Sequence, residues 1–115
     1  MKKLKDAKNV PTSLKAGFAH FYIRVFGDVH GLNPRNKGAV THRTRSIDLD
    51  GTSVLGDGAE VLLHEVLHVA YENGGLSTIF DNQAEEKIIN ILSTQLATMM
   101  HDNPDLFRWI IKNVG

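Results

Sequence analysis

The chain has 115 residues, of which 42% are hydrophobic and 23% are charged, and this composition is that of a globular domain rather than a disordered or fibrous one. It contains no cysteine, which excludes a disulfide framework, a thiolate nucleophile and a Cys-ligated metal. Lys plus Arg equals Asp plus Glu at 13 each, so net charge gives no reason to expect nucleic acid or an anionic membrane as a partner. We expect a single domain over residues 1–115, with any metal held by His, Asp or Glu.

The N-terminus is basic but is not followed by an apolar run, so no signal peptide is expected. The longest uncharged stretch with apolar character, residues 88–100, is interrupted by polar residues and is too short for a transmembrane helix. We therefore expect a cytoplasmic domain that has no membrane partner. Its charged lead-in, residues 1–9, is expected to fray.

The first half of the chain has strand-like patterns. Residues 10–26 are rich in aromatic and β-branched side chains, with Gly17 as a turn or bulge within them. Residues 27–38 have the Gly, Asn, Asp and Pro content of a loop. Residues 39–49 are predicted to form a second strand, and since neither of its faces is cleanly apolar, an edge or half-exposed strand is expected.

The second half has helical patterns. Asp57 stands three residues before Glu60, which is a capping spacing, so a helix is predicted from 58 to 73 and is ended by the sequence Asn73-Gly74-Gly75. A second helix is predicted from Asp81 or Asn82 to His101. Its apolar residues form one stripe: Ile88, Ile89, Leu92, Leu96 and Met99.

A short third helix is predicted over residues 104–113. It starts with a proline in its first turn, where the missing N–H is not needed, and it is rich in large apolar side chains.

The first predicted helix contains the sequence His64-Glu65-Val66-Leu67-His68, an H-E-x-x-H motif. Histidines at i and i+4 lie about 6 Å apart on one helix face, so both imidazoles can reach one metal ion. Glu65 lies about 100° around the helix from His64, where it can hydrogen-bond a water molecule beside that ion. This arrangement is typical of zinc peptidases, and the alternative is two surface histidines on an amphipathic helix.

A catalytic zinc site needs a third protein ligand. The extended pattern with a third histidine is excluded, because Tyr71 and Gly74 occupy the positions that it would assign to glycine and histidine. Glu85 and Glu86 open the next helix and are the candidates. Helical periodicity places Glu85 in line with the apolar stripe and so favours it as the buried carboxylate, while a carboxylate can also serve simply to complement the helix N-terminus.

Residues 61–109 resemble small phage-encoded metallopeptidases related to the ImmA/IrrE family. The resemblance is carried by residues 62–70, by the Glu85-Glu86 pair, by Leu92-Ser93 and by residues 102–104. The family pattern around its downstream ligand is E-x-x-x-N-x-(aromatic or Leu)-(Ala or Ser). Glu86 matches that pattern and Glu85 does not, so the resemblance implies Glu86 as the third ligand. No helix-turn-helix is recognised, so self-contained DNA binding is not expected.

The resemblance implies an α+β fold, a minimal zincin-like domain (gluzincin type). In it a small antiparallel sheet precedes the H-E-x-x-H helix, a ligand helix and a short C-terminal helix. One Zn²⁺ per chain would be held by His64, His68 and Glu86. Asn90 is a candidate to hold a ligand in place.

The predicted function is zinc-dependent hydrolysis of a peptide or protein substrate, with Glu65 as the general base. The strand near 39–49 would pair with an extended substrate if it is an edge. For a phage protein, the compartment would be the host cytoplasm. Tyr71 and His101 are weaker candidates for stabilising the transition state, because a core tyrosine and a histidine at a helix end are the more common explanations for them. The alternative function is a catalytically inactive metal-binding interaction module of phage origin.

Overall fold

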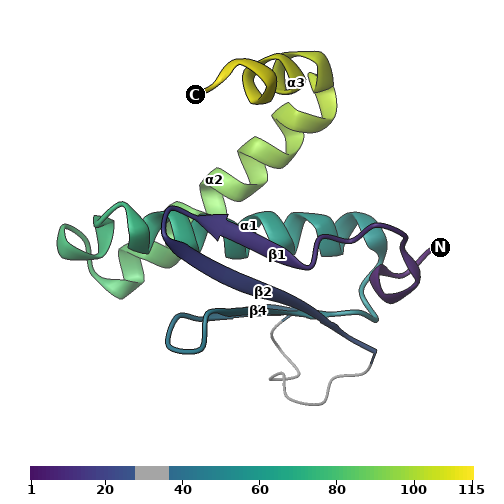
Figure 1. Cartoon of the computed structure of the whole chain (residues 1–115), viewed down its shortest axis with the longest axis horizontal. Helices are drawn as coiled ribbons and strands as arrows, with labels where there is room; N and C mark the ends of the chain where they lie inside the picture. Colours follow the sequence, from purple (N-terminus) through teal and green to yellow (C-terminus); the bar gives the residue numbers. More distant parts are fainter. Residues whose placement is uncertain (28–36) are drawn as a thin grey trace.

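The computed structural model describes residues 1–27 and 37–115, and it is an α+β domain with a four-stranded sheet and three α-helices (Figure 1). The loop predicted over 27–38 lies mostly outside the described residues. The strands are β1 (Ser13–Ala16), β2 (Ala19–Phe26), β3 (Gly38–Thr41) and β4 (Ser46–Asp50). The α-helices are α1 (Leu55–Asn73), α2 (Asn82–Asp102) and α3 (Pro104–Asn113), and short 3₁₀ helices cover Leu4–Asp6 (η1) and Leu76–Thr78 (η2).

The sheet is mixed, whereas the sequence predicted an antiparallel one. Its strand order is β1-β2-β4-β3, in which β2 and β4 run parallel and the other two pairs run antiparallel. The parallel pair arises because the chain leaves β2, returns to form the β3–β4 hairpin, and inserts β4 rather than β3 beside β2. This order leaves β3 at one edge of the sheet, as expected for part of the 39–49 segment.

Each of the two strand-like segments is a hairpin, as Gly17 indicated for the first, whereas the segment 39–49 was predicted to be one strand. The first turns at Gly17, whose φ of 64° is readily adopted by glycine. The second turns at residues 42–45, between the paired residues Thr41 and Ser46. This turn contains no Gly, Pro, Asn or Asp, and Arg45 takes up the left-handed conformation with a φ of 52°. Because the usual turn residues are absent, the sequence pattern predicted one continuous strand across residues 39–49.

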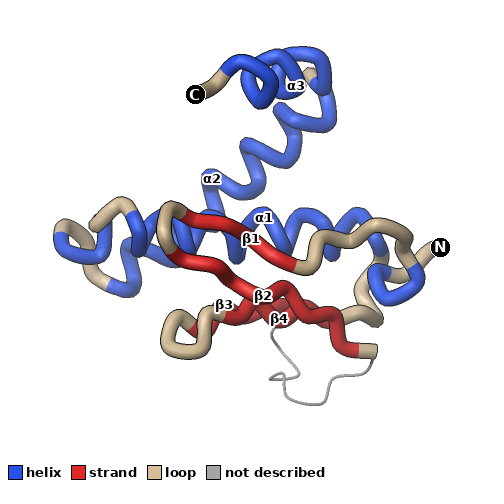
Figure 2. The backbone as a smooth tube through the Cα atoms, in the orientation of Figure 1, coloured by secondary structure: helices blue, strands red, loops and turns tan. Residues whose placement is uncertain are grey.

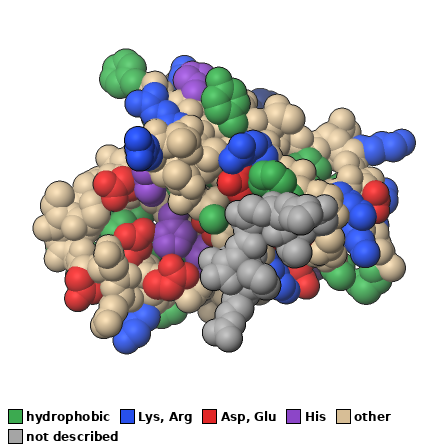
Figure 3. All heavy atoms as spheres, turned by 90° about the horizontal axis from the view of Figure 1, so that it is seen from below, with side chains coloured by type: hydrophobic (Ala, Val, Ile, Leu, Met, Phe, Trp, Pro, Cys, Tyr) green, Lys and Arg blue, Asp and Glu red, His purple; other side chains and the backbone are tan. Residues whose placement is uncertain are grey.

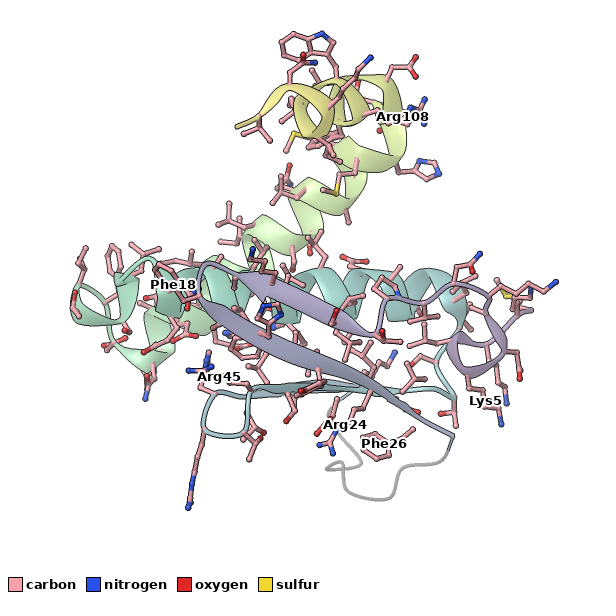
Figure 4. All side chains as sticks on the ribbon, in the orientation of Figure 1. Lys5, Phe18, Arg24, Phe26, Arg45 and Arg108 are labelled. Atoms are coloured by element: carbon pink, nitrogen blue, oxygen red, sulfur yellow. The ribbon has the colours of Figure 1, made fainter. Side chains whose placement is uncertain are left out.

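The helix α1 covers one face of the sheet (Figure 2). Between the two layers lies a core cluster whose buried members come from η1, β2, β4 and α1: Leu4, Phe21, Ile23, Ile47, Leu49 and Val69. Arg24 on β2 pairs with Asp48 on β4 at 2.7 Å, and its guanidinium lies 5.5 Å from the centre of the Phe26 ring (Figure 4).

The helix α1 begins at Leu55, three residues before the predicted start. Val54 occupies the N-cap position and Asp57 lies in the first turn, so the prediction that Asp57 caps this helix is wrong. Gly58 is an interior position where the 3₁₀ helix η1 packs closely, since a Cβ there would lie 2.9 Å from Leu4 Cδ2. The lead-in predicted to fray therefore contributes a core residue, because Leu4 is only 4% exposed.

The other helix boundaries match the sequence predictions closely. The helix α1 ends at Asn73, and Gly75 follows with a φ of 81°. The helix α2 starts after Asp81, whose carboxylate accepts a hydrogen bond from the Ala84 N–H at 2.8 Å. Within the described residues, no helix is both long enough and apolar enough to cross a membrane.

The predicted apolar stripe of α2 is buried only in part. Ile89 is 2% exposed, but Leu92 is 44% exposed and Met99 is 42% exposed. The first half of α2 packs against α1, whereas its second half stands away from the body and carries α3 at its far end (Figure 1). Periodicity therefore identified the face of the helix correctly but not how far along the helix that face is covered.

Candidate metal centre

The two motif histidines and Glu86 meet between α1 and α2. One ligand atom from each of the three residues can be chosen so that all lie within 4.8 Å of one another. The Nε2 atoms of His64 and His68 are 3.1 Å apart, as expected for histidines one helical turn apart on the same face. The two carboxylate oxygens of Glu86 lie 3.2 Å from these nitrogens, one on each histidine.

A second polar layer holds the outer nitrogens of both imidazoles. The Nδ1 atom of His68 is 2.7 Å from Glu85 Oε2, and Nδ1 of His64 is 3.4 Å from the hydroxyl oxygen of Ser93. A carboxylate only accepts, so His68 must donate through Nδ1 and its neutral tautomer leaves a lone pair on Nε2. Ser93 can donate to the carbonyl of Asn90, at 3.3 Å, and accept from His64.

This hydrogen bonding orients the three residues, His64, His68 and Glu86, as a possible metal-binding set. With both Nδ1 atoms acting as donors, the two Nε2 lone pairs point toward each other and toward a carboxylate, which is unfavourable unless a proton or a cation lies between them. Burial first, and then the neighbouring His68, lowers the pKa of His64, while Glu86 opposes the shift. The group of His64, His68 and Glu86 could therefore hold a metal ion.

Glu65 points to the same pocket from the buried side of α1. It is 6% exposed, and burial raises its pKa to about 7, with Glu86 adding to the shift and His68 opposing it. A carboxyl group with a pKa close to neutral can both take up and release a proton near pH 7. Without a metal ion, its proton also relieves the cost of a second negative charge beside Glu86.

The metal-binding set lines a pocket of about 700 Å³ that lies between α1, α2 and the edge strand β3. Figure 3 shows histidine side chains surrounded by acidic ones on this face of the molecule. The strand comes close to the helix at Gly38, where a Cβ would lie 2.6 Å from Val61 Cγ1 and 3.3 Å from Glu65 Cγ. Gly38 therefore lets the sheet edge reach the pocket beside Glu65.

The structure separates the remaining sequence candidates. Tyr71 is 2% exposed and is absent from the pocket lining, and its hydroxyl has no hydrogen-bond partner among the described residues. Burial raises its pKa, and nearby carboxylates, Glu85 foremost, raise it further. His101 is 88% exposed at the end of α2, where it pairs with Asp102. Neither residue lies in the pocket, whereas Asn90 does line it.

Sequence reasoning missed two side chains on the sheet side of this pocket, Lys37 and His42. His42 lies in the turn between β3 and β4, and its ring meets Phe21 edge-on with centroids 6.0 Å apart. It has no partner at ligand spacing in the sequence, so only the tertiary fold brings it to the site. The hydrogen bond from His68 to Glu85 was missed as well, although the periodicity that placed Glu85 on the buried side was the signal for it.

Comparison of the chain with protein-family models, with curated proteins and with solved structures finds no match. The likeness to the ImmA/IrrE family thus rests on the motif residues and their spacing. What the site does has to be argued from its geometry and chemistry.

Proposed function

We propose that this protein is a zinc-dependent peptidase of the minimal gluzincin type, related to the ImmA/IrrE family. The observation that carries the proposal is the convergence of two Nε2 atoms and a carboxylate on an open pocket that also contains a buried glutamate. Zinc bonds of about 2.0–2.1 Å place tetrahedral ligand atoms about 3.3 Å apart. The spacings of 3.1 Å and 3.2 Å among these atoms suit that geometry.

In this proposal His64, His68 and Glu86 would hold one zinc ion per chain at the pocket. When bound there, zinc would supply Lewis-acid chemistry, which polarises a carbonyl group and lowers the pKa of a water molecule. Glu65 accepts a proton from the attacking water and passes it to the nitrogen of the leaving amine. Because its pKa is raised to about 7 by burial, Glu65 is suited to both halves of that transfer.

The sheet edge favours an extended peptide as the substrate. The outer side of β3 pairs with no other described strand, and three of its residues, Gly38, Ala39 and Val40, line the pocket. A peptide that adds to this edge through backbone hydrogen bonds would pass alongside the metal-binding set. Lys37 and His42, on the same side of the pocket, would be the donors available to the carbonyl oxygen of the scissile bond.

The test compares zinc content and peptide cleavage in wild type, Glu65→Gln and Glu86→Ala. Glu65→Gln should keep one zinc per chain and lose at least about 100-fold in hydrolysis of a peptide library, because glutamine cannot accept the proton. Glu86→Ala should lose zinc. Glu72→Gln, at an exposed position on the same helix as Glu65, is the matched control and should retain both properties.

Three results would count against parts of this proposal. If the zinc-loaded wild type cleaves no peptide of the library, the alternative of a metal-binding interaction module takes its place. If Glu65→Gln cleaves as fast as wild type, Glu65 is not the base. Zinc content of zero in the wild type, with zinc supplied, would overturn the metal assignment itself.

A further inference from the structure

The zero net charge of the chain conceals a separation of charge between its two halves. Residues 1–27 and 37–50, which include the whole sheet, carry nine Lys or Arg and three Asp or Glu, a formal charge of +6. Residues 51–101, which include α1 and the metal-binding set, carry one Lys and seven Asp or Glu, a formal charge of −6. The sheet half therefore attracts anions although the chain as a whole is neutral.

One end of the sheet carries exposed aromatic and basic side chains on the face that α1 does not cover. The residues of β2 alternate, and the buried ones, such as Phe21, belong to the core beneath α1. His20 and Tyr22 therefore lie on the open face, and Lys15 of β1 is the cross-strand partner of His20.

The two hairpin turns complete this part of the sheet. Phe18 stands immediately before β2, and Arg43 and Arg45 lie in the turn between β3 and β4. Figure 4 shows Phe18 and Arg45 at the same end of the sheet, with Lys5 at the opposite end of the molecule. We call the following six exposed residues the aromatic–basic surface: Lys15, Phe18, His20, Tyr22, Arg43 and Arg45.

The cations of the aromatic–basic surface have no internal counter-charge among the described residues. None of Lys15, Arg43 and Arg45 forms an ion pair there. By contrast Arg24, further along the same face, donates to both carboxylate oxygens of Asp48, at 2.7 Å and 3.0 Å. That neutral pair marks where the surface ends, so its positive charge is concentrated at the two turns.

The aromatic rings narrow the choice of anion. Phe18 is 106% exposed and Tyr22 is 66% exposed, so both rings present their faces to solvent. Single-stranded nucleic acid offers phosphates for the cations and unstacked bases for the rings, and sheets that bind it use aromatic side chains in this way. An acidic peptide would match the charge but would leave both rings in water, and a duplex keeps its bases stacked inside.

We propose that the aromatic–basic surface binds single-stranded nucleic acid, with bases stacked on its two rings and phosphates paired with its three Lys and Arg side chains. The surface lies on the sheet face away from α1, whereas the metal-binding set lies between α1 and α2. The inference therefore does not depend on the proposed peptidase activity.

The wild type provides the first test. Fluorescence anisotropy measures binding of labelled oligo-dT and oligo-U of about 12 nucleotides, a length within the usual site sizes. With three cations engaged, the logarithm of the binding constant should fall with the logarithm of salt with a slope of about −2, from about −0.7 per phosphate. Binding of either strand supports the proposal, and the two arms distinguish DNA from RNA. Failure of both strands to bind at low salt would overturn it, as would equally tight binding of an oligo-dA–oligo-dT duplex.

Matched variants provide the second test. Tyr22→Leu should raise the dissociation constant about 5- to 100-fold, the range for loss of one stacked base, whereas Tyr22→Phe keeps the ring and should bind like wild type. Arg45→Gln should reduce the size of the salt slope by about 0.7. Lys5→Gln removes a cation from the same basic half at the opposite end, and it should leave both quantities unchanged.

Circular dichroism establishes that the variants fold, and the wild-type measurements stand without them. Binding that is weakened by Lys5→Gln but not by Arg45→Gln would place the nucleic acid elsewhere and overturn the proposal. Polyglutamate that binds more tightly than either oligonucleotide, with a loss in Arg45→Gln and none in Tyr22→Leu, would assign the surface to an acidic protein and overturn it as well.

Discussion

The two halves of α2 belong to one continuous helix but have opposite surroundings. In the first half, two glutamates and a serine face the histidines of α1, and Ile89 beside them is 2% exposed. In the second half, apolar side chains such as Met99 lie in solvent, and α3 continues this pattern. In the first half of α2, polar side chains face α1, whose side chains form hydrogen bonds or ion pairs with them. In the second half, apolar side chains are exposed because no other described element packs on them. Amphipathic periodicity alone does not distinguish these two situations.

The largest expected difference between the covered half of α2 and the exposed α3 is the loss of unfolding free energy when an isoleucine is truncated to alanine. Ile89→Ala in the covered half should lower the free energy of unfolding by about 2–5 kcal/mol, because it leaves a cavity. Ile111→Ala in α3, where the side chain is 71% exposed, should change it by less than about 0.5 kcal/mol. Both are isoleucines in helices, so intrinsic helix propensity contributes equally to the two changes.

Urea denaturation measures both values, at protein concentrations where the chain is monomeric. A cost of about 2 kcal/mol or more for Ile111→Ala under those conditions would mean that α3 packs onto the body of its own chain. The contrast between the two halves would then not hold in solution.

The contrast also indicates how much the sequence can predict. The ends of α2 and α3 follow from local signals such as Asp81 and Pro104, and the pairing of His64 with His68 follows from helix geometry. The mixed sheet did not follow, because its parallel pair joins residues that are distant in the sequence. The turn at 42–45 carries no turn-forming residue, so the position of His42 beside the site depends entirely on the tertiary fold.

The glutamate pair shows how periodicity and resemblance each described part of the site. Periodicity placed Glu85 on the buried side, and its side chain is 18% exposed against 56% for Glu86. The resemblance pointed to Glu86, and Glu86 is the residue whose oxygens lie near both Nε2 atoms. A carboxylate does not have to be deeply buried to reach a metal ion at the mouth of a pocket, so burial alone could not choose between the two roles.

Glu65 of α1, in the pocket beside the covered half of α2, should also give the metal-free protein a characteristic pH dependence. The pKa of Glu65 is raised to about 7 in the folded state from an ordinary value of 4.5. Between these values the folded state binds the proton more tightly than the unfolded state, so this group makes stability fall as pH rises from about 4.5 to about 7. The loss amounts to at most about 3 kcal/mol, from 1.36 kcal/mol per pKa unit.

The measurement is urea denaturation of wild type and Glu65→Gln across that pH range with a chelator present. The difference between the two free energies of unfolding isolates Glu65 from the other titrating groups. Relative to wild type, Glu65→Gln should gain stability as pH rises, and the gain should level off above pH 7. A difference that stays constant with pH would mean that the carboxyl is ionised throughout and that burial does not perturb it.

The smallest expected effect is that of Glu85, and it tests whether the covered half positions a metal ligand or only packs. Glu85 accepts from Nδ1 of His68 at 2.7 Å and thereby orients the ring and increases the basicity of Nε2. Glu85→Gln preserves the size of the side chain but replaces a charged acceptor with a neutral amide. Zinc affinity should fall by about 10–100-fold, the range for losing an outer partner of a ligand. A competition titration with a chromogenic chelator measures this change in zinc affinity.

Gln83 lies two residues earlier in the same first turn and is exposed, so Gln83→Ala is the control and should leave zinc affinity unchanged. If Glu85→Gln binds zinc as tightly as wild type, the Glu85 carboxylate only complements the N-terminus of α2, and the packing of His68 against α2 is sufficient to hold its ring.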